Sequence, residues 1–191
     1  SFEGLREDWH GTIDLTKGTF NRKKILPNTS SNVTLVSGWV QDTVENFLKE
    51  KIEDLNKQKV KLKVIGKKNF SPKLNSLLNL SERKTYKNKR LQINLALNYG
   101  SKAELIYAFK ELRKNKELIN EKNLKRYLHT KDIPDPEILI RTGNTKRLSN
   151  FLLWQIAYSE IFFEKKLWPD FNEKDYFKII KKYKTIKRNF G

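Results

Sequence analysis

A cluster of cationic and hydroxyl side chains near residue 145 has the composition of a phosphate-binding site. Arg141, Arg147 and Ser149 fall within nine residues of the segment RTGNTKRLSN. A guanidinium presents paired, planar donors to phosphate oxygens, and a hydroxyl adds another donor. If a helix opens here, its free N–H groups and its dipole also favour an anion. This spacing predicts a clamp for a diphosphate, although Arg141 taken alone would be read as a surface salt-bridge residue.

One carboxylate, Glu160, follows the cluster beyond a long apolar run. At helical spacing it would lie about three and a half turns beyond Arg147, too far to touch the same phosphate. We therefore expect Glu160 to serve a neighbouring site or a site across a dimer interface. The plainer interpretation is a solvated helix residue.

Polar residues also follow an earlier predicted strand, in the stretch Asn98–Tyr99–Gly100–Ser101. The cluster with Gly143 follows a later one. Because ligands bind at the carboxyl ends of parallel strands, we expect Asn98, Tyr99 and Gly143 to line the same site. The alternative for Asn98 and Tyr99 is that they only terminate a strand.

Hydropathy periodicity predicts the elements that must position these residues. Helical spacing of apolar residues marks two main helices, and alternation or short apolar runs mark three strands. Ser149 and Asn150 are predicted to cap a helix from 151 to 163, and Asn172 with Asp175 to cap the last helix. The expected helices are 39–56, 74–80, 102–115, 121–128, 151–163 and 173–188, and the expected strands are 59–65, 91–97 and 138–140.

Helices that alternate with buried strands predict an α/β fold with a mostly parallel sheet flanked by helices, in a single domain. We expect this domain to span residues 39–191 and to follow a divergent N-terminal segment, residues 1–38. A chain of 191 residues with 37% hydrophobic residues is large enough to bury a core.

Composition narrows the chemistry and the partners. The chain has no cysteine, which excludes disulfides and thiolate metal sites, and His10 and His129 lack any paired ligand. A net charge of +18 attracts polyanions, whether nucleic acid, an anionic membrane or a diphosphate substrate. Without an apolar span or a secretory pattern, we expect a cytoplasmic protein, with peripheral membrane contact left open.

Two stretches of the chain resemble a known family. The segment PDPEILIRTGNTKRLSNFLLWQIAYSEIFFEKKLWPDF, residues 134–171, and the terminal RNFG resemble the C-terminal signature of the cis-prenyltransferases, the undecaprenyl diphosphate synthase family. LALNYGSKAEL is similar to the central Asn-Tyr-Gly segment of that family. The resemblance extends from about Val44 to Gly191.

The resemblance implies a transferase that condenses isopentenyl diphosphate onto an allylic diphosphate, such as farnesyl diphosphate, to make a long-chain polyprenyl diphosphate with Mg²⁺. It implies that Arg141, Arg147 and Ser149 hold the isopentenyl diphosphate and that Glu160 helps to bind Mg²⁺. It also implies a homodimer, for which the aromatic residues of 151–163 would supply core or interface packing.

One family motif has no counterpart here. Members carry an Asp-Gly-Asn-Gly-Arg-Trp loop for Mg²⁺ and the allylic diphosphate, whereas this chain contains no Asp-Gly dipeptide. Two alternatives therefore stay open, a noncatalytic synthase-like subunit and an incomplete synthase. A basic nucleic-acid-binding protein ranks last, because the aromatic residues occupy apolar helical positions and not an exposed stacking surface. We expect no nucleic-acid partner.

Overall fold

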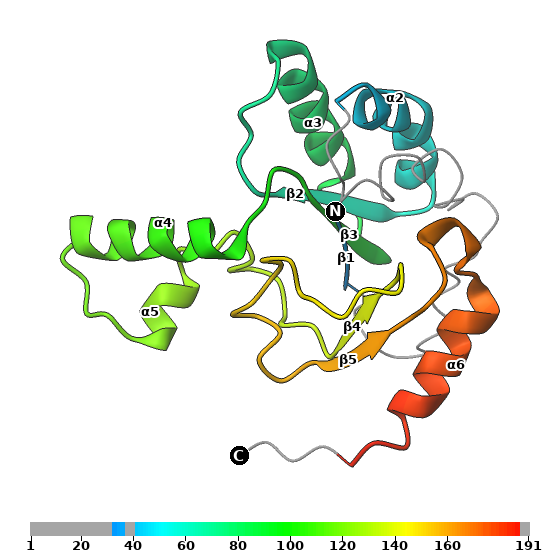
Figure 1. Ribbon diagram of the computed structural model, residues 1–191. Helices are drawn as coiled ribbons and strands as arrows, with labels where there is room; N and C mark the ends of the chain where they lie inside the picture. Colours follow the sequence, from blue (N-terminus) through cyan, green and yellow to red (C-terminus); the bar gives the residue numbers. More distant parts are fainter. Residues whose placement is uncertain (1–31, 37–40, 188–191) are drawn as a thin grey trace.

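The strands of this protein form two small parallel sheets flanked by helices (Figure 1). The computed structural model describes residues 32–36 and 41–187. In chain order the elements are β1 Asn32–Val36, α2 Gln41–Lys57, β2 Val60–Ile65, α3 Pro72–Thr85, β3 Leu91–Ala96, α4 Ser101–Lys114, α5 Glu121–Lys125, β4 Ile138–Arg141, β5 Glu160–Phe163, the 3-10 turn η4 Trp168–Asp170, and α6 Glu173–Tyr183.

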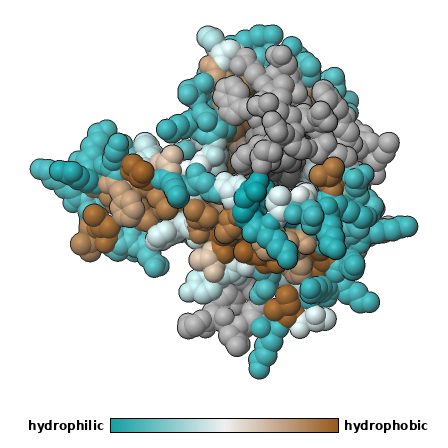
Figure 2. Space-filling model, viewed as in Figure 1, coloured by the Kyte–Doolittle hydropathy of each residue, from teal (hydrophilic) through white to brown (hydrophobic). Residues whose placement is uncertain are grey.

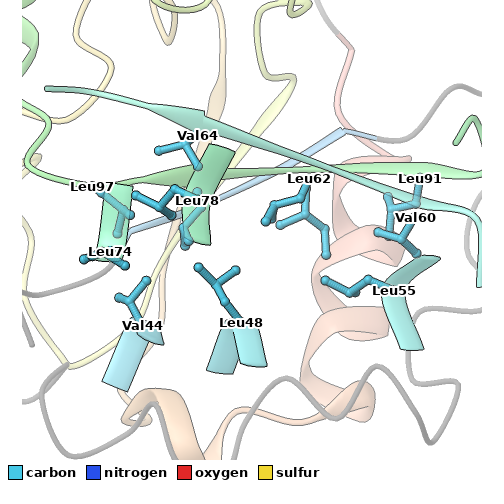
Figure 3. Close-up of a cluster of buried hydrophobic side chains, with 12 residues drawn as sticks. Val44, Leu48, Leu55, Val60, Leu62, Val64, Leu74, Leu78, Leu91 and Leu97 are labelled. Carbon is cyan, nitrogen blue, oxygen red and sulfur yellow. The ribbon is translucent and has the colours of Figure 1, made fainter. Parts of the chain in front are cut away.

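The larger sheet has the strand order β1-β3-β2, with every pair parallel. β3 lies in the middle, where Ile93 pairs with Val33 on one side and Leu62 on the other. α2 and α3 pack against this sheet and bury a cluster of aliphatic side chains (Figure 3). Its buried members are Val44, Leu48, Leu55, Val60, Leu62, Val64, Leu74, Leu78, Leu91, Ile93, Leu95 and Leu97.

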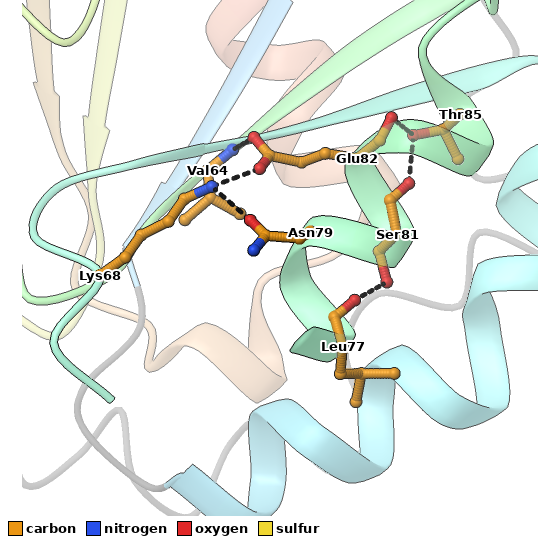
Figure 4. Close-up of polar contacts among 7 residues, drawn as sticks. All are labelled: Val64, Lys68, Leu77, Asn79, Ser81, Glu82 and Thr85. Carbon is orange, nitrogen blue, oxygen red and sulfur yellow. Dashed lines mark hydrogen bonds and ion pairs between the residues drawn. The ribbon is translucent and has the colours of Figure 1, made fainter. Parts of the chain in front are cut away.

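Side chains cover the outer edge of β2. The amides of Leu62, Val64 and Gly66 point away from β3 and donate in turn to Thr85 Oγ1 at 3.0 Å, Glu82 Oε1 at 2.8 Å and His129 Nδ1 at 2.9 Å. Figure 4 shows Glu82 reaching Val64 from α3. An uncovered strand edge is a template for pairing with another chain, so these bonds both satisfy the amides and close the edge.

The smaller sheet pairs β4 with β5 in parallel, from Ile138 opposite Glu160 to Arg141 opposite Phe163. α6 lies beside it. Its first turn has a complete capping box, in which Asn172 and Asp175 bond each other's backbone as predicted. Tyr183 near its end donates to the carboxylate of Glu137 at 2.9 Å.

α4 and α5 form an arm, residues 101–125, that extends to the left in Figure 1. Its inner surface buries Ala108, Leu112 and Leu124. Its outer surface carries exposed apolar side chains, visible as brown atoms at the left of Figure 2. The exposed large hydrophobic residues of the arm are Ile106, Tyr107, Phe109, Leu118 and Ile119.

The prediction of a helix over residues 151–163 is wrong. Residues 151–158 form consecutive bends and turns, and Glu160–Phe163 is the strand β5. Ser149, Asn150 and Leu152 have φ of 49°, 61° and 46°, in the left-handed region that a right-handed helix cannot contain. Ser149 and Asn150 consequently do not cap a helix beginning at residue 151. The apolar run instead buries Leu152 and Ile156 against the ends of β2 and β3.

The other predicted elements are present, with shifted ends. The helix expected at 74–80 is longer, since α3 begins at Pro72 and continues to Thr85. The strand expected to be buried at 138–140 is β4, which is only half-buried because it belongs to the smaller sheet. Among the described residues, no helix has both the length and the apolar character to span a bilayer.

Candidate functional site: a basic loop beside the start of α4

The predicted phosphate-binding residues lie on one loop, residues 141–150, which we call the clamp loop. It begins at the carboxyl end of β4, where Gly143 and Asn144 turn the chain with φ of 85° and 53°. The Gly143 amide donates to the Lys166 carbonyl at 2.8 Å, and the Asn144 amide donates to the Glu164 carbonyl at 3.0 Å. The start of the loop is therefore held against the segment that follows β5.

Two guanidinium groups share this loop. Arg141 is half-buried and its Nε donates to Thr145 Oγ1 at 2.9 Å, whereas Arg147 is exposed. Burial, and secondarily the charge of Arg147, lower the pKa of Arg141 below its ordinary value. The two positive charges repel each other. A multivalent anion bound between them would offset this repulsion. Arg141 and Arg147 thus stay candidates for the predicted diphosphate clamp.

The far end of the clamp loop meets the start of α4. The Ser101 amide donates to the Asn150 carbonyl at 2.9 Å, and the Lys102 amide donates to Asn150 Oδ1 at 2.8 Å. A Cβ on Gly100 would come within 2.8 Å of Asn150 Nδ2, so the Asn150 side chain lies directly against Gly100. The structure therefore places Gly100, Ser101 and Lys102 beside Asn150 at the end of the clamp loop.

Asn98 and Tyr99 occupy different surroundings. Asn98 is half-buried, and its amide donates to Asn69 Oδ1 at 2.5 Å. The Tyr99 hydroxyl donates to Glu104 Oε2, also at 2.5 Å, and burial together with Glu104 raises the pKa of Tyr99. Both remain candidates for lining the site.

A buried polar network behind the site escaped the sequence analysis. The Glu104 carboxylate accepts from the Tyr99 hydroxyl, from the His129 amide at 2.8 Å and from Gln155 Nε2 at 3.0 Å. Glu104 is 2% exposed and shares a buried face of α4 with Ser101. The sequence did carry one sign of this burial. Glu104 lies at helical spacing from Ser101 and Ala108, on the same face of the predicted helix.

Glu160 lies away from the clamp loop within the chain. It starts β5 opposite Ile138, whereas Arg141 ends β4 opposite Phe163. Three residues of strand separate these ends by about 10 Å. Within the described ranges, the Glu160 side chain has no hydrogen bond or ion pair, and no three acidic or histidine side chains gather as a metal site.

Parallel strands flanked by helices, with two arginines on the loop that follows β4, define an α/β protein. Residues 28–191 match the family model described as "Putative undecaprenyl diphosphate synthase". The chain belongs to this family, the cis-prenyltransferases.

Individual relatives agree with the family match. The chain is 42% identical to an isoprenyl transferase of Fusobacterium nucleatum over 76% of this chain and 64% of the relative. It is 40% identical to the Buchnera aphidicola ditrans,polycis-undecaprenyl-diphosphate synthase ((2E,6E)-farnesyl-diphosphate specific), over 75% of this chain and 61% of the relative. The chain thus spans somewhat less than two thirds of the length of these relatives.

Solved structures share the fold. A probable undecaprenyl diphosphate synthase of Campylobacter jejuni superposes with a TM-score of 0.79 at 32% identity, covering 93% of this chain and 90% of that one. Lavandulyl diphosphate synthase of Lavandula x intermedia, solved with dimethylallyl diphosphate, gives 0.78 at 27% identity, covering 93% and 87%. These matches confirm the predicted α/β fold with parallel strands and flanking helices.

Proposed function

We propose that this chain is a cis-prenyltransferase that adds isopentenyl diphosphate to an allylic diphosphate, such as farnesyl diphosphate, and makes a long-chain polyprenyl diphosphate. The observation that carries the proposal is the match of residues 28–191 to the undecaprenyl diphosphate synthase family, together with the presence of Arg141, Arg147 and Ser149 on one loop at the end of β4. Family membership and the names of the bacterial relatives support the same chemistry.

In this reaction the isopentenyl double bond forms a carbon–carbon bond to the allylic carbon, the allylic diphosphate leaves, and one proton is lost from the isopentenyl unit. The residues assigned here act on the diphosphate that stays. Arg141 and Arg147 would pair with its oxygens, and Ser149 would donate a hydroxyl hydrogen bond. Holding this substrate in place makes the reaction between the two diphosphates effectively unimolecular, which raises its rate.

Magnesium enters the proposal through Glu160. Mg²⁺ is commonly held by one or two carboxylates together with substrate phosphate oxygens, so a single half-buried carboxylate fits as one ligand. When bound, the ion would neutralise charge on the departing diphosphate. Because Glu160 lies at the opposite end of the β4–β5 pair from Arg141, it would serve a different phosphate from the one the clamp loop holds.

A second candidate function is an isopentenyl diphosphate-binding subunit without turnover. The sequence observation that favours it is that the chain contains no Asp-Gly dipeptide, the start of the family's allylic-site loop. Under this alternative the clamp loop would bind its ligand in the same way. The two candidates differ only in whether product forms.

An assay with labelled isopentenyl diphosphate, farnesyl diphosphate and Mg²⁺ tests the proposal. We expect the 191-residue chain to form extended labelled product, and Arg147→Ala to reduce the rate at a fixed low substrate concentration. Binding of isopentenyl diphosphate without product would support the second candidate. Product formation at an unchanged rate and an unchanged KM in Arg147→Ala would contradict the clamp assignment.

A further inference from the structure

We infer that Asn150 is a positioning residue, which holds the clamp loop in place by capping α4 from outside the helix. The inference rests on the proposed role of Arg147 and Ser149 as diphosphate ligands. It adds a residue that does not touch the ligand and acts through its neighbours in the loop.

The start of α4 depends on Asn150. The N-cap residue of this helix is Gly100, which has no side chain to bond the free amides of the first turn. Asn150 supplies two acceptors instead, its carbonyl for Ser101 and its Oδ1 for Lys102.

The connection is reciprocal. The Leu153 amide, just after the clamp loop, donates to Ser101 Oγ at 3.0 Å, and Ser101 is fully buried. One turn further along α4, buried Glu104 accepts from Gln155 at 3.0 Å. Three consecutive links therefore fasten residues 150–155 to one face of α4.

The clamp loop needs this support because its distal half has no regular structure. Arg141 is held by the sheet, since it ends β4. Arg147 and Ser149 lie beyond that sheet, and Ser149 and Asn150 have φ of 49° and 61°. Asparagine tolerates this left-handed conformation better than most residues, so residue 150 combines the required backbone with the required acceptor. We conclude that Asn150 sets the distance from the Arg141 side of the clamp to the Arg147 side.

The test is a calorimetric titration of the full chain with isopentenyl diphosphate. Asn150→Gly keeps the left-handed conformation accessible, removes the side-chain acceptor and adds backbone freedom. Asn115→Gly is the matched control, because Asn115 caps the other end of α4 and bonds the Glu111 carbonyl. Ser101→Ala removes the hydroxyl that accepts from the Leu153 amide and keeps the backbone bond to Asn150, so it tests the neighbouring link between α4 and the segment after the loop. Arg147→Ala reports on the clamp itself.

We expect Asn150→Gly and Ser101→Ala each to raise the Kd about fivefold or more, the effect of losing one hydrogen bond, with Asn115→Gly within about twofold of wild type. If Arg147→Ala weakens binding while Asn150→Gly and Ser101→Ala do not, the positioning role is overturned and the clamp stands. Equal losses in Asn150→Gly and Asn115→Gly would also overturn it, since general loss of α4 stability would explain them. Unchanged binding in Arg147→Ala would instead remove the clamp assignment on which the inference rests.

Discussion

At the scale of residues, the clamp loop is a place where like charges are held together. Arg141 is half-buried beside Arg147, and its lowered pKa records the cost of burial and of the second guanidinium. A protein gains nothing for stability from such a pair, because each charge disfavours the other. In the proposed clamp, an anionic ligand would offset this repulsion between the two guanidinium groups.

Removing one guanidinium should therefore weaken ligand binding strongly. Arg147→Ala should raise the Kd for isopentenyl diphosphate by roughly tenfold to 150-fold, which corresponds to about 1.5–3 kcal/mol for a charge-assisted hydrogen bond. Calorimetric titration measures this directly. Lys146→Ala is the control for general charge, since Lys146 is an exposed neighbour on the same loop. Equal losses in the two variants would mean that only net charge attracts the ligand.

His129 should make the stability of this protein depend on pH. Its Nδ1 accepts from the Gly66 amide, which requires the neutral ring, and burial lowers the pKa of His129 below its ordinary value of 6.5 despite the opposing effect of Glu104. As the pH falls, His129 is protonated in the unfolded chain before it is protonated in the folded chain. The contribution of neutral His129 to the free energy of unfolding is therefore fully present above pH 6.5 and is lost as the pH falls toward the folded-state pKa.

Urea unfolding at several pH values measures this dependence. His129→Gln should flatten the fall in the free energy of unfolding below pH 6.5, since glutamine does not titrate. His10→Gln removes the only other histidine and should leave the fall unchanged. If the free energy of unfolding of His129→Gln still falls below pH 6.5 as in the unsubstituted chain, groups other than His129 cause the fall.

At the scale of elements, the sequence predicted those whose pattern is long and regular. α2 and α4 show sustained helical spacing, and β2 alternates lysine with aliphatic residues, so each was found near its true position. The run Phe151–Phe163 has similar apolar content but was misassigned. A short apolar run fits a helix or a strand equally well, and the left-handed residues before it are set by contacts with α4 that periodicity does not encode.

Some residues of the candidate site were suggested by the sequence, and others were found only in the structure. The clamp residues were proposed from the sequence because guanidinium and hydroxyl groups suit phosphate, and their ligand role stays a prediction. Glu104 and Gln155 could not, because a buried carboxylate becomes meaningful only when residues from distant segments surround it. The position of Glu160 at the far end of the β4–β5 pair likewise follows from strand pairing. The sequence analysis also expected Glu160 to lie away from Arg147, but it derived this from a helix over residues 151–163 that is not present.

The covered edge of β2 yields a prediction on stability. Thr85→Val keeps the shape of the side chain but leaves the buried Leu62 amide without its acceptor. This should lower the free energy of unfolding by about 1–3 kcal/mol, the cost of an unsatisfied buried donor. Urea unfolding measures it against Thr185→Val, an exposed site at the end of α6, which should change stability by less than about 0.5 kcal/mol. Equal effects would show that the edge bond contributes little.

At the scale of the whole molecule, exposed apolar surface favours self-association. The arm carries Leu118 and Ile119 at 75% and 63% exposure. Further apolar residues, Tyr158, Ile161 and Phe163, are exposed around β5. Surfaces of this kind mark protein interfaces more often than free solvent-facing regions. The homodimer that the family resemblance implies stays a prediction, and it would cover part of this surface.

Sedimentation velocity tests this assembly. At tens of micromolar the protein should sediment as a dimer with twice the 22.7 kDa mass of one chain. Leu118→Asp with Ile119→Asp should shift the population toward monomer if the arm contributes to the interface, because buried charge opposes association. A species of 22.7 kDa at the same concentration for the unsubstituted chain would contradict the dimer.

The central claim is that the clamp loop holds the diphosphate of isopentenyl diphosphate, and a crystal structure of the chain with that compound bound tests it most directly. The account predicts diphosphate oxygens within hydrogen-bond distance of the Arg141 and Arg147 guanidinium groups and of the Ser149 hydroxyl. A diphosphate bound elsewhere in a fully occupied complex, with both guanidinium groups left in solvent, would contradict it.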